Sequence, residues 1–207
     1  MRGGEIKNDL LANIPMRRLL QGDVGSGKTL VGALSALHAS SNGYQTALLC
    51  PTEILAEQHF TSFSDWFKKL GIKVMLLTGS TKAKERKIIT EDLAAGKIDI
   101  LIGTHAIFQS GIEFNSLGLT VIDEQHRFGV HQRFSMLEKG GKTNQSPHQL
   151  IMTATPIPRT LAMTVYGSLE TSIIDELPPG RNPVQTSSRP DSFREKVIKR
   201  VEEVCLT

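Results

Sequence analysis

The feature that most constrains the fold of this chain is a glycine-rich segment, residues 22–29, with the sequence GDVGSGKT. It fits the pattern G-x-x-x-x-G-K-[ST] without a mismatch. Residues 17–21 before it are short and apolar enough for a buried strand, and residues 30–37 after it are typical of a helix. In a strand–loop–helix of this kind, backbone N–H groups and the helix N-terminus face phosphate oxygens. The segment therefore predicts a nucleoside triphosphate site. A plain glycine-rich turn with a surface lysine is the alternative, which the two flanks disfavour.

Two side chains of this loop have distinct expected tasks. Lys28 would meet the β- and γ-phosphates as a point charge and is a candidate catalytic residue, and the Thr29 hydroxyl would hold Mg²⁺. The other candidate nucleotide-binding residues are those whose backbone would surround the phosphates: Gly22, Asp23, Val24, Gly25, Ser26 and Gly27.

Length and composition suit a globular α/β domain, or one domain and a fragment of another. The chain has 207 residues, of which 39% are hydrophobic and 22% charged. The net charge of +3 is compatible with nucleic acid binding without requiring it. Cys50 and Cys205 lack disulfide or metal spacing, which favours a reducing compartment. Without a signal-like start or a membrane-spanning apolar run, a cytoplasmic protein with no membrane partner is expected.

Short apolar runs alternate with helix-like segments along most of the chain. Further strand-like runs lie at 46–50, 73–77, 99–102, 119–122 and 149–152, and helix-like segments lie at 53–70, 82–95, 130–138 and 159–166. This alternation predicts an α/β fold with a mostly parallel sheet covered by helices on both faces. Ligands of such sheets bind at the carboxyl ends of the strands. Polar residues that follow each strand are therefore the candidate functional residues.

Two carboxylates, Asp123 and Glu124, directly follow the apolar run 119–122. At a strand's carboxyl end, Asp123 could hold Mg²⁺ and Glu124 could polarise an attacking water as a general base. Adjacent carboxylates also occur on ordinary surfaces, so a solvated strand end is the alternative. The phosphate loop upstream favours the catalytic interpretation.

Several blocks, taken in order, resemble superfamily-two helicases of the D-E-x-H group and, within them, the RecG family. The matching blocks are 22–29 (motif I), 51–59 (motif Ia), 78–80 and 103–109 (blocks on the nucleic-acid path), 123–130 (motif II) and 153–160 (motif III). Ser26, Gln125 and the block 104–108 favour RecG over the similar transcription–repair coupling factor, and 127–130 does not resemble the primosomal helicase. The resemblance implies a RecA-like P-loop domain that binds ATP and Mg²⁺.

The resemblance also implies roles for residues beyond the nucleotide loop. Those that would contact the DNA sugar–phosphate backbone are Pro51, Thr52, Thr78, Gly79, Thr104 and His105. Those that would couple the ATP site to this surface are Gln125, His126, Thr153 and Thr155. Each has an ordinary structural explanation when taken singly, and their order around one phosphate loop favours the functional one. The histidines without metal-ligand spacing are expected to have no chemical role: His38, His59, His131 and His148.

The expected organisation has three parts: a truncated N-terminal lead-in (1–16), a first RecA-like motor lobe (17–177), and a linker with the start of a truncated second lobe (178–207). The family's adenine-recognition block would lie upstream, with 5–9 resembling its end. Branched DNA is the implied partner, together with a second helicase lobe and a wedge domain that this sequence lacks.

We therefore expect the ATP-binding motor lobe of a RecG-like helicase that remodels branched DNA or stalled forks in recombination and repair. Alone, such a lobe should be weakly active or inactive, because it has no second lobe to close against. The alternatives are a non-catalytic nucleotide-binding module from a truncated gene, or the motor lobe of a translocase like the transcription–repair coupling factor. A small-molecule kinase is disfavoured, since it would not need the blocks at 51–59 and 153–155.

Overall fold

The computed structural model describes residues 3–12, 14–124, 146–155, 169–175 and 186–205. It divides the chain into two units, Met1–Leu177 and Pro178–Thr207, which are described separately. The helices predicted at 130–138 and 159–166 lie outside the described residues. Within the described part, no helix combines the length and the apolarity needed to cross a membrane.

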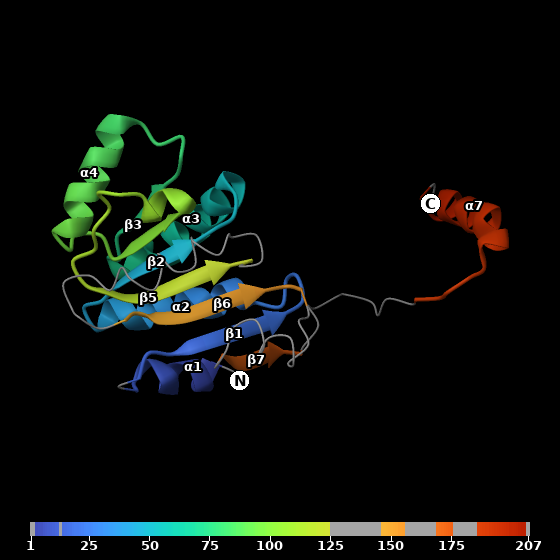
Figure 1. The fold of residues 1–207 in the computed structure, drawn as a ribbon, viewed down its shortest axis with the longest axis horizontal. Helices are drawn as coiled ribbons and strands as arrows, with labels where there is room; N and C mark the ends of the chain where they lie inside the picture. The colour runs from blue at the N-terminus through green and yellow to red at the C-terminus, as the bar shows by residue number, and fades with distance from the viewer. Residues whose placement is uncertain (1–2, 13, 125–145, 156–168, 176–185, 206–207) are drawn as a thin grey trace. The chain divides into compact units, whose positions relative to one another are not determined.

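The first unit is built on a seven-stranded sheet in which every pair of neighbouring strands is parallel. The strands are β1 (Arg17–Gly22), β2 (Gln45–Leu49), β3 (Val74–Leu77), β4 (Ile100–Gly103), β5 (Leu117–Asp123), β6 (His148–Thr153) and β7 (Glu170–Ile174). Their spatial order is β3-β4-β2-β5-β6-β1-β7 (Figure 1). The predicted α/β class with a parallel sheet is confirmed.

Helices cover both faces of this sheet. They are α1 (Gly3–Leu10), α2 (Lys28–Ser41) and α3 (Glu53–Phe67) on one face, and α4 (Ala83–Ala94) with the 3₁₀ helix η2 (His105–Phe108) on the other. Successive strand residues point to opposite faces, so Leu48 of β2 packs with the first group and Leu49 with the second. Both leucines are fully buried, which explains why β2 is apolar without interruption.

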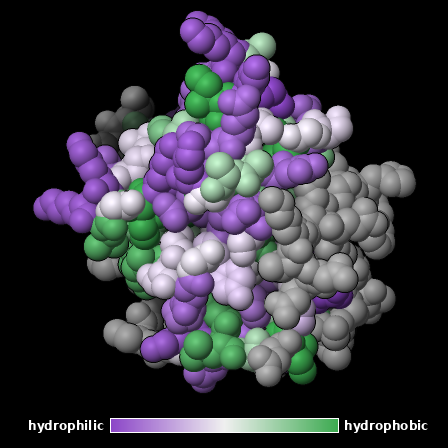
Figure 2. Space-filling model, turned by 90° about the vertical axis from the view of Figure 1, so that its left-hand side faces the viewer, coloured by the Kyte–Doolittle hydropathy of each residue, from purple (hydrophilic) through white to green (hydrophobic). Residues whose placement is uncertain are grey.

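The charged segment between β3 and β4 forms the exposed side of α4. Lys84, Glu85 and Lys87 are exposed, whereas Ile89 and Leu93 are buried against the sheet. Figure 2, which views the molecule from the side where α4 lies in Figure 1, shows hydrophilic residues over much of this face, with hydrophobic residues in separate groups. The charged residues of α4 therefore face solvent and its apolar residues face the sheet, which explains the amphipathic pattern of this segment.

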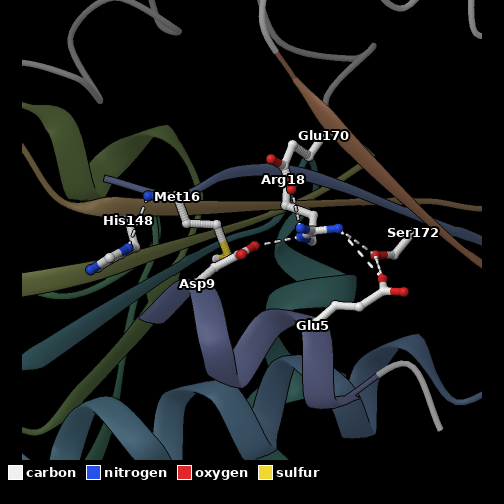
Figure 3. Close-up of polar contacts among 7 residues, drawn as sticks. All are labelled: Glu5, Asp9, Met16, Arg18, His148, Glu170 and Ser172. Atoms are coloured by element: carbon white, nitrogen blue, oxygen red, sulfur yellow. Dashed lines mark hydrogen bonds and ion pairs between the residues drawn. The ribbon is translucent and has the colours of Figure 1, made fainter. Parts of the chain in front are cut away.

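A buried arginine joins α1 and β7 to the sheet (Figure 3). Arg18 of β1 is 6% exposed, and its guanidinium donates to Asp9 Oδ2 (2.6 Å) and to Ser172 Oγ (2.8 Å). It also forms ion pairs with Glu5 (3.5 Å) and Glu170, and Ser172 donates to Glu5 Oε2 (2.5 Å). A guanidinium can serve several acceptors in fixed directions. Thus Arg18 connects one helix and one edge strand to β1, and the acidic residues near the N-terminus hold α1 in place.

The start of β1 is also bonded to the start of β6. The backbone N–H of Met16 donates to Nδ1 of His148 at 2.9 Å (Figure 3). The pKa of His148 is lowered by burial, against a smaller opposing effect of the Asp9 charge, which keeps Nδ1 available as an acceptor. His148 therefore has a structural role at the strand's amino end, away from the carboxyl edge.

The second unit contains the 3₁₀ helix η4 (Asp191–Phe193) followed by α7 (Arg194–Cys205). Four apolar residues recur three or four positions apart along this segment, the spacing of one helix face. Within this unit, the stripe residues Phe193, Val197, Val201 and Val204 are all exposed.

Replacing Arg18 tests the first unit's polar cluster. Arg18→Met should lower the free energy of unfolding by about 1–3 kcal/mol, because it removes the hydrogen bonds that the buried guanidinium donates to Asp9 and Ser172. Urea denaturation followed by circular dichroism measures this change. The matched control is Arg17→Met, at an exposed neighbouring position, which should change stability by less than about 0.5 kcal/mol. Equal stability of the two variants would contradict the structural role of Arg18.

Candidate nucleotide-binding site

Parallel pairing places the carboxyl ends of all the strands at one edge of the sheet, where the predicted site residues gather. Strands β5, β6 and β1 are neighbours, so Asp123, Thr153 and Gly22 end adjacent strands. On the other side of β5, the neighbouring strands β2, β4 and β3 are followed by the residues expected to contact DNA. The edge therefore has a candidate nucleotide half and a candidate nucleic-acid half.

The loop after β1 has the backbone geometry that its glycines permit. Gly27 has φ 91° and precedes the first residue of α2, a conformation that favours glycine over any residue with a side chain. A Cβ on Gly22 would lie 2.5 Å from Ser26 Oγ, too close to be accommodated without a shift. Ser26 Oγ itself is buried and has no hydrogen-bond partner among the described residues. The loop thus opens directly onto the N-terminus of α2, as a phosphate-binding loop requires.

The Lys28 side chain folds into this loop. Its Nζ donates to the backbone carbonyls of Gly22 (2.7 Å) and Asp23 (2.8 Å). Burial lowers the pKa of Lys28, and the charges of Glu124, Asp123 and Asp23 oppose that effect. The strands that end at the loop and at Asp123 are both paired with β6, so the loop and the two carboxylates lie at neighbouring strand ends. Thr29 follows in the first turn of α2 and is half-buried.

Asp123 is the last residue of β5, and its carboxylate is held from the helix that follows β2. Its Oδ2 lies 2.9 Å from Nε2 of His59 on α3. His59 was expected to have no chemical role, so sequence reasoning missed this contact, which spans 64 positions in the chain. The one available signal is that His59 is a polar residue on the inward stripe of α3, between the buried Ala56 and Phe63.

Glu124 has an unusual backbone conformation and a well-defined set of partners. Its φ is 51°, a sparsely populated value for a residue other than glycine, and its N–H donates to Met152 O at 2.9 Å. Its carboxylate accepts from Thr153 Oγ1 (3.0 Å) and from Ala154 N (2.9 Å). The N–H of Thr155 in turn donates to Thr153 Oγ1 at 3.1 Å. Backbone strain of this kind is concentrated at functional sites, where the surrounding contacts maintain it.

The structure thus brings together the predicted catalytic residues and part of the predicted coupling set. Lys28, Asp123 and Glu124 share one site, and Thr153 and Thr155 belong to the same hydrogen-bonded network as Glu124. The other two coupling candidates, Gln125 and His126, lie outside the described residues.

The described residues contain no group of three or more His, Cys, Asp or Glu side chains placed to hold a metal ion. Magnesium does not need such a group, because proteins typically bind it through one or two carboxylates, with substrate phosphates and water completing its octahedron. Asp123, together with the Thr29 hydroxyl, is a donor set of this type.

The residues expected to contact DNA lie in three turns at the ends of β2, β3 and β4. Thr52, Gly79 and His105 are exposed, and Pro51 is half-buried. The side chains of Thr78 and Thr104 are buried, at 3% and 4% exposure, so their hydroxyls lie below the surface. At the turns of Thr78 and Thr104, contacts with DNA would therefore come from the exposed neighbouring residues and from the backbone.

Two further side chains, which the sequence did not distinguish, tie these turns together. Glu53 at the start of α3 accepts from the N–H (3.2 Å) and the hydroxyl (2.9 Å) of Ser80, and the hydroxyl contact is the main cause that lowers the pKa of Glu53. Arg86 of α4 donates to Thr78 O (3.1 Å) and to Gln109 Oε1 (3.0 Å). Arg86 lies in the charged run 82–87, and because its neighbours there are also charged, the sequence does not single it out.

Comparisons with known proteins show the family of the chain. Residues 6–164 match the family model described as DEAD/DEAH box helicase. The chain belongs to the DEAD/DEAH box helicase family, and membership implies ATP binding.

Two similar curated relatives are RecG helicases. The chain is 58% identical over 203 residues to the ATP-dependent DNA helicase RecG of Escherichia coli (strain K12), which covers 98% of this chain and 29% of the relative. It is 53% identical over 199 residues to RecG of Aquifex aeolicus, and this match covers 96% of the chain and 25% of the relative. The predicted resemblance to RecG is confirmed, and the chain spans 29% and 25% of the length of these two relatives.

Two solved structures have a similar fold. A structure of RecG bound to a three-way DNA junction superposes with a TM-score of 0.78 at 45% identity, covering 96% of this chain and 26% of that one. The DUF1998 helicase MrfA bound to DNA gives a TM-score of 0.65 at 19% identity, covering 85% and 27%. The second likeness shows the fold alone.

Lys28→Ala tests the loop. We expect the affinity for ATP to fall by about 100-fold, because the loop would lose a charged donor that contributes about 3 kcal/mol. Fluorescence titration with a mant-labelled ATP measures the affinity. Lys82→Ala, at an exposed lysine before α4, is the control and should bind as the native chain does. Unchanged affinity in Lys28→Ala would place the nucleotide elsewhere.

Proposed function

We propose that this chain is the ATP- and Mg²⁺-binding motor lobe of a RecG-like ATP-dependent DNA helicase that remodels branched DNA. The observation that carries the proposal is geometric: β1, which leads into the Lys28 loop, and β5, which ends at Asp123, flank β6, and Glu124 accepts hydrogen bonds from Thr153 and Ala154 at the end of β6. A phosphate loop alone would support nucleotide binding. The additional link from the carboxylates to residues 153–155 is what a motor needs, because it connects the nucleotide to another segment.

In this proposal the loop residues and Lys28 bind the triphosphate. The backbone of residues 22–27 surrounds the phosphates, and Lys28 leaves its two carbonyl partners to contact them. Thr29 and Asp123 would hold the magnesium ion, which neutralises charge on the phosphates when bound. Glu124 orients the attacking water and accepts its proton.

Coupling follows from the shared partners of Glu124. Its two carboxylate oxygens accept bonds from Thr153 and Ala154, so a change in what Glu124 binds must alter those bonds. Gln125 and His126 are proposed to take part in the same link. The DNA would lie along the turns after β2, β4 and β3, contacting the residues Pro51, Thr52, Thr78, Gly79, Thr104 and His105. Such contacts to sugar and phosphate position a strand without selecting its sequence.

Branched DNA is proposed as the substrate because the similar RecG structure is bound to a three-way DNA junction. We propose stalled forks in recombination and repair as the setting. We also propose that a second helicase lobe and a wedge domain work with this lobe, since the chain spans only about 29% of the length of the RecG relatives. Alone, the lobe is then weakly active or inactive.

Glu124→Gln tests the assigned chemistry. The amide keeps the shape of the side chain but cannot accept a proton, so ATP hydrolysis should disappear while mant-ATP affinity stays within about threefold. Phosphate release is measured with three-way junction DNA, for the chain alone and with the second lobe of Escherichia coli RecG added in trans. Glu113→Gln, at an exposed position, is the control.

Two results would contradict the proposal. Hydrolysis by Glu124→Gln at the native rate would exclude Glu124 as the base. Turnover above about one ATP per second by the chain alone would contradict its dependence on a second lobe.

A further inference from the structure

His59 is a buried polar side chain to which the proposed function assigns no task. It lies on the inward stripe of α3 together with Ala56, Phe63 and Phe67, and it is 8% exposed. Its ring packs edge-on against Phe63, with centroids 6.3 Å apart and an interplanar angle of 85°. The imidazole is thereby held in one orientation, with Nε2 directed at Asp123 Oδ2 at 2.9 Å.

The sheet order explains how His59 reaches this position. Strand β2 is the neighbour of β5, and α3 begins directly after the turn that follows β2. His59 lies in the second turn of α3, about 10 Å along the helix from its cap at Thr52. From there the side chain meets the last residue of β5. The contact between His59 of α3 and Asp123 of β5 therefore lies beside the nucleotide half of the sheet edge.

The contact limits how the Asp123 carboxylate can turn. It uses Oδ2, which leaves Oδ1 for a cation. The side chains of His59 and Asp123 are 10% and 14% exposed, so water has little access to replace the bond. Carboxylates that bind metals are commonly oriented by a hydrogen bond of this kind from a neighbouring side chain.

We propose that His59 is a positioning residue for the magnesium half of the nucleotide site, where it holds the Asp123 carboxylate in the orientation that binds Mg²⁺ together with ATP. This inference rests on the proposed function, which assigns Mg²⁺ to Asp123. It adds the residue that orients the ligand.

Packing alone does not account for a histidine at this position. An apolar residue would continue the buried stripe of α3 with Phe63 and Phe67 but would leave the mostly buried carboxylate without its hydrogen bond. The nearby Cys50 thiol does not offer a charge, because burial and, secondarily, the charge of Asp123 raise its pKa far above neutrality. Among the described residues, His59 is the partner placed to orient Asp123.

A matched pair of amides tests the role. His59→Gln places an N–H donor near the position of Nε2, whereas His59→Asn is one methylene shorter and withdraws it. The mant-ATP affinity of the 207-residue chain is titrated with Mg²⁺ and is also measured in EDTA. We expect His59→Asn to raise the half-saturating Mg²⁺ concentration about tenfold or more, and His59→Gln to stay within about threefold of the native chain. In EDTA, the mant-ATP affinity of the native chain and of both variants should be equal.

Thermal unfolding separates positioning from folding. If His59→Asn does not fold, His59→Leu fills the apolar stripe without offering a donor and should show the same rise in the Mg²⁺ requirement. A native Mg²⁺ requirement in the folded donor-free variant overturns the inference. So does an equal loss in His59→Gln and His59→Asn, because that result would reflect structure alone.

Asp123→Asn separates this inference from the function on which it rests. If the metal assignment is right, Asp123→Asn should greatly weaken the effect of Mg²⁺ on mant-ATP binding. A native Mg²⁺ response in Asp123→Asn would contradict the proposed function itself. An impaired response in Asp123→Asn with a native response in His59→Asn would overturn only the role of His59.

Discussion

The site depends on the parallel pairing of β5, β6 and β1. Because these strands are neighbours and run in the same direction, their carboxyl ends bring together Gly22, Asp123 and Thr153, which are far apart in the chain. The Lys28 side chain folds back into the loop after β1, and the charges of Asp123, the last residue of β5, and of Glu124 act on its ammonium. An antiparallel β1 would carry the loop to the opposite edge and separate these charges. The Arg18 cluster contributes by holding β1 between its helix and its edge strand.

Two hydrogen-bonded connections leave this site in different directions. One runs from Glu124 to Thr153 and Ala154 at the end of β6. The other runs from Asp123 to His59 and so to α3, whose first residues stand at the turn after β2. Each carboxylate of the pair is therefore attached to a separate element. The unusual φ of Glu124 turns its side chain toward β6, while Asp123 is bonded to α3. This division lets adjacent residues have different tasks.

Local pattern predicted much of this arrangement. The run 46–50 corresponds to β2 (Gln45–Leu49), and the segment 53–70 to α3 and the 3₁₀ turn after it, because buried strands and amphipathic helices have distinct apolar periods. The edge strand β7 and helix α1 were not predicted, since each is short and partly polar, and both depend on Arg18. The contact of His59 was not predicted for a related reason. Its partner lies 64 positions away, and no local spacing encodes that distance. The domain boundaries and the roles of the site residues remain predictions.

The most direct measurement of the central claim is a crystal structure of the chain with Mg²⁺ and a non-hydrolysable ATP analogue. The account predicts that Lys28 Nζ leaves the carbonyls of Gly22 and Asp23 to contact the phosphates, with Mg²⁺ bound near Thr29 and Asp123. A nucleotide bound away from this loop, with Lys28 still on both carbonyls, would contradict it.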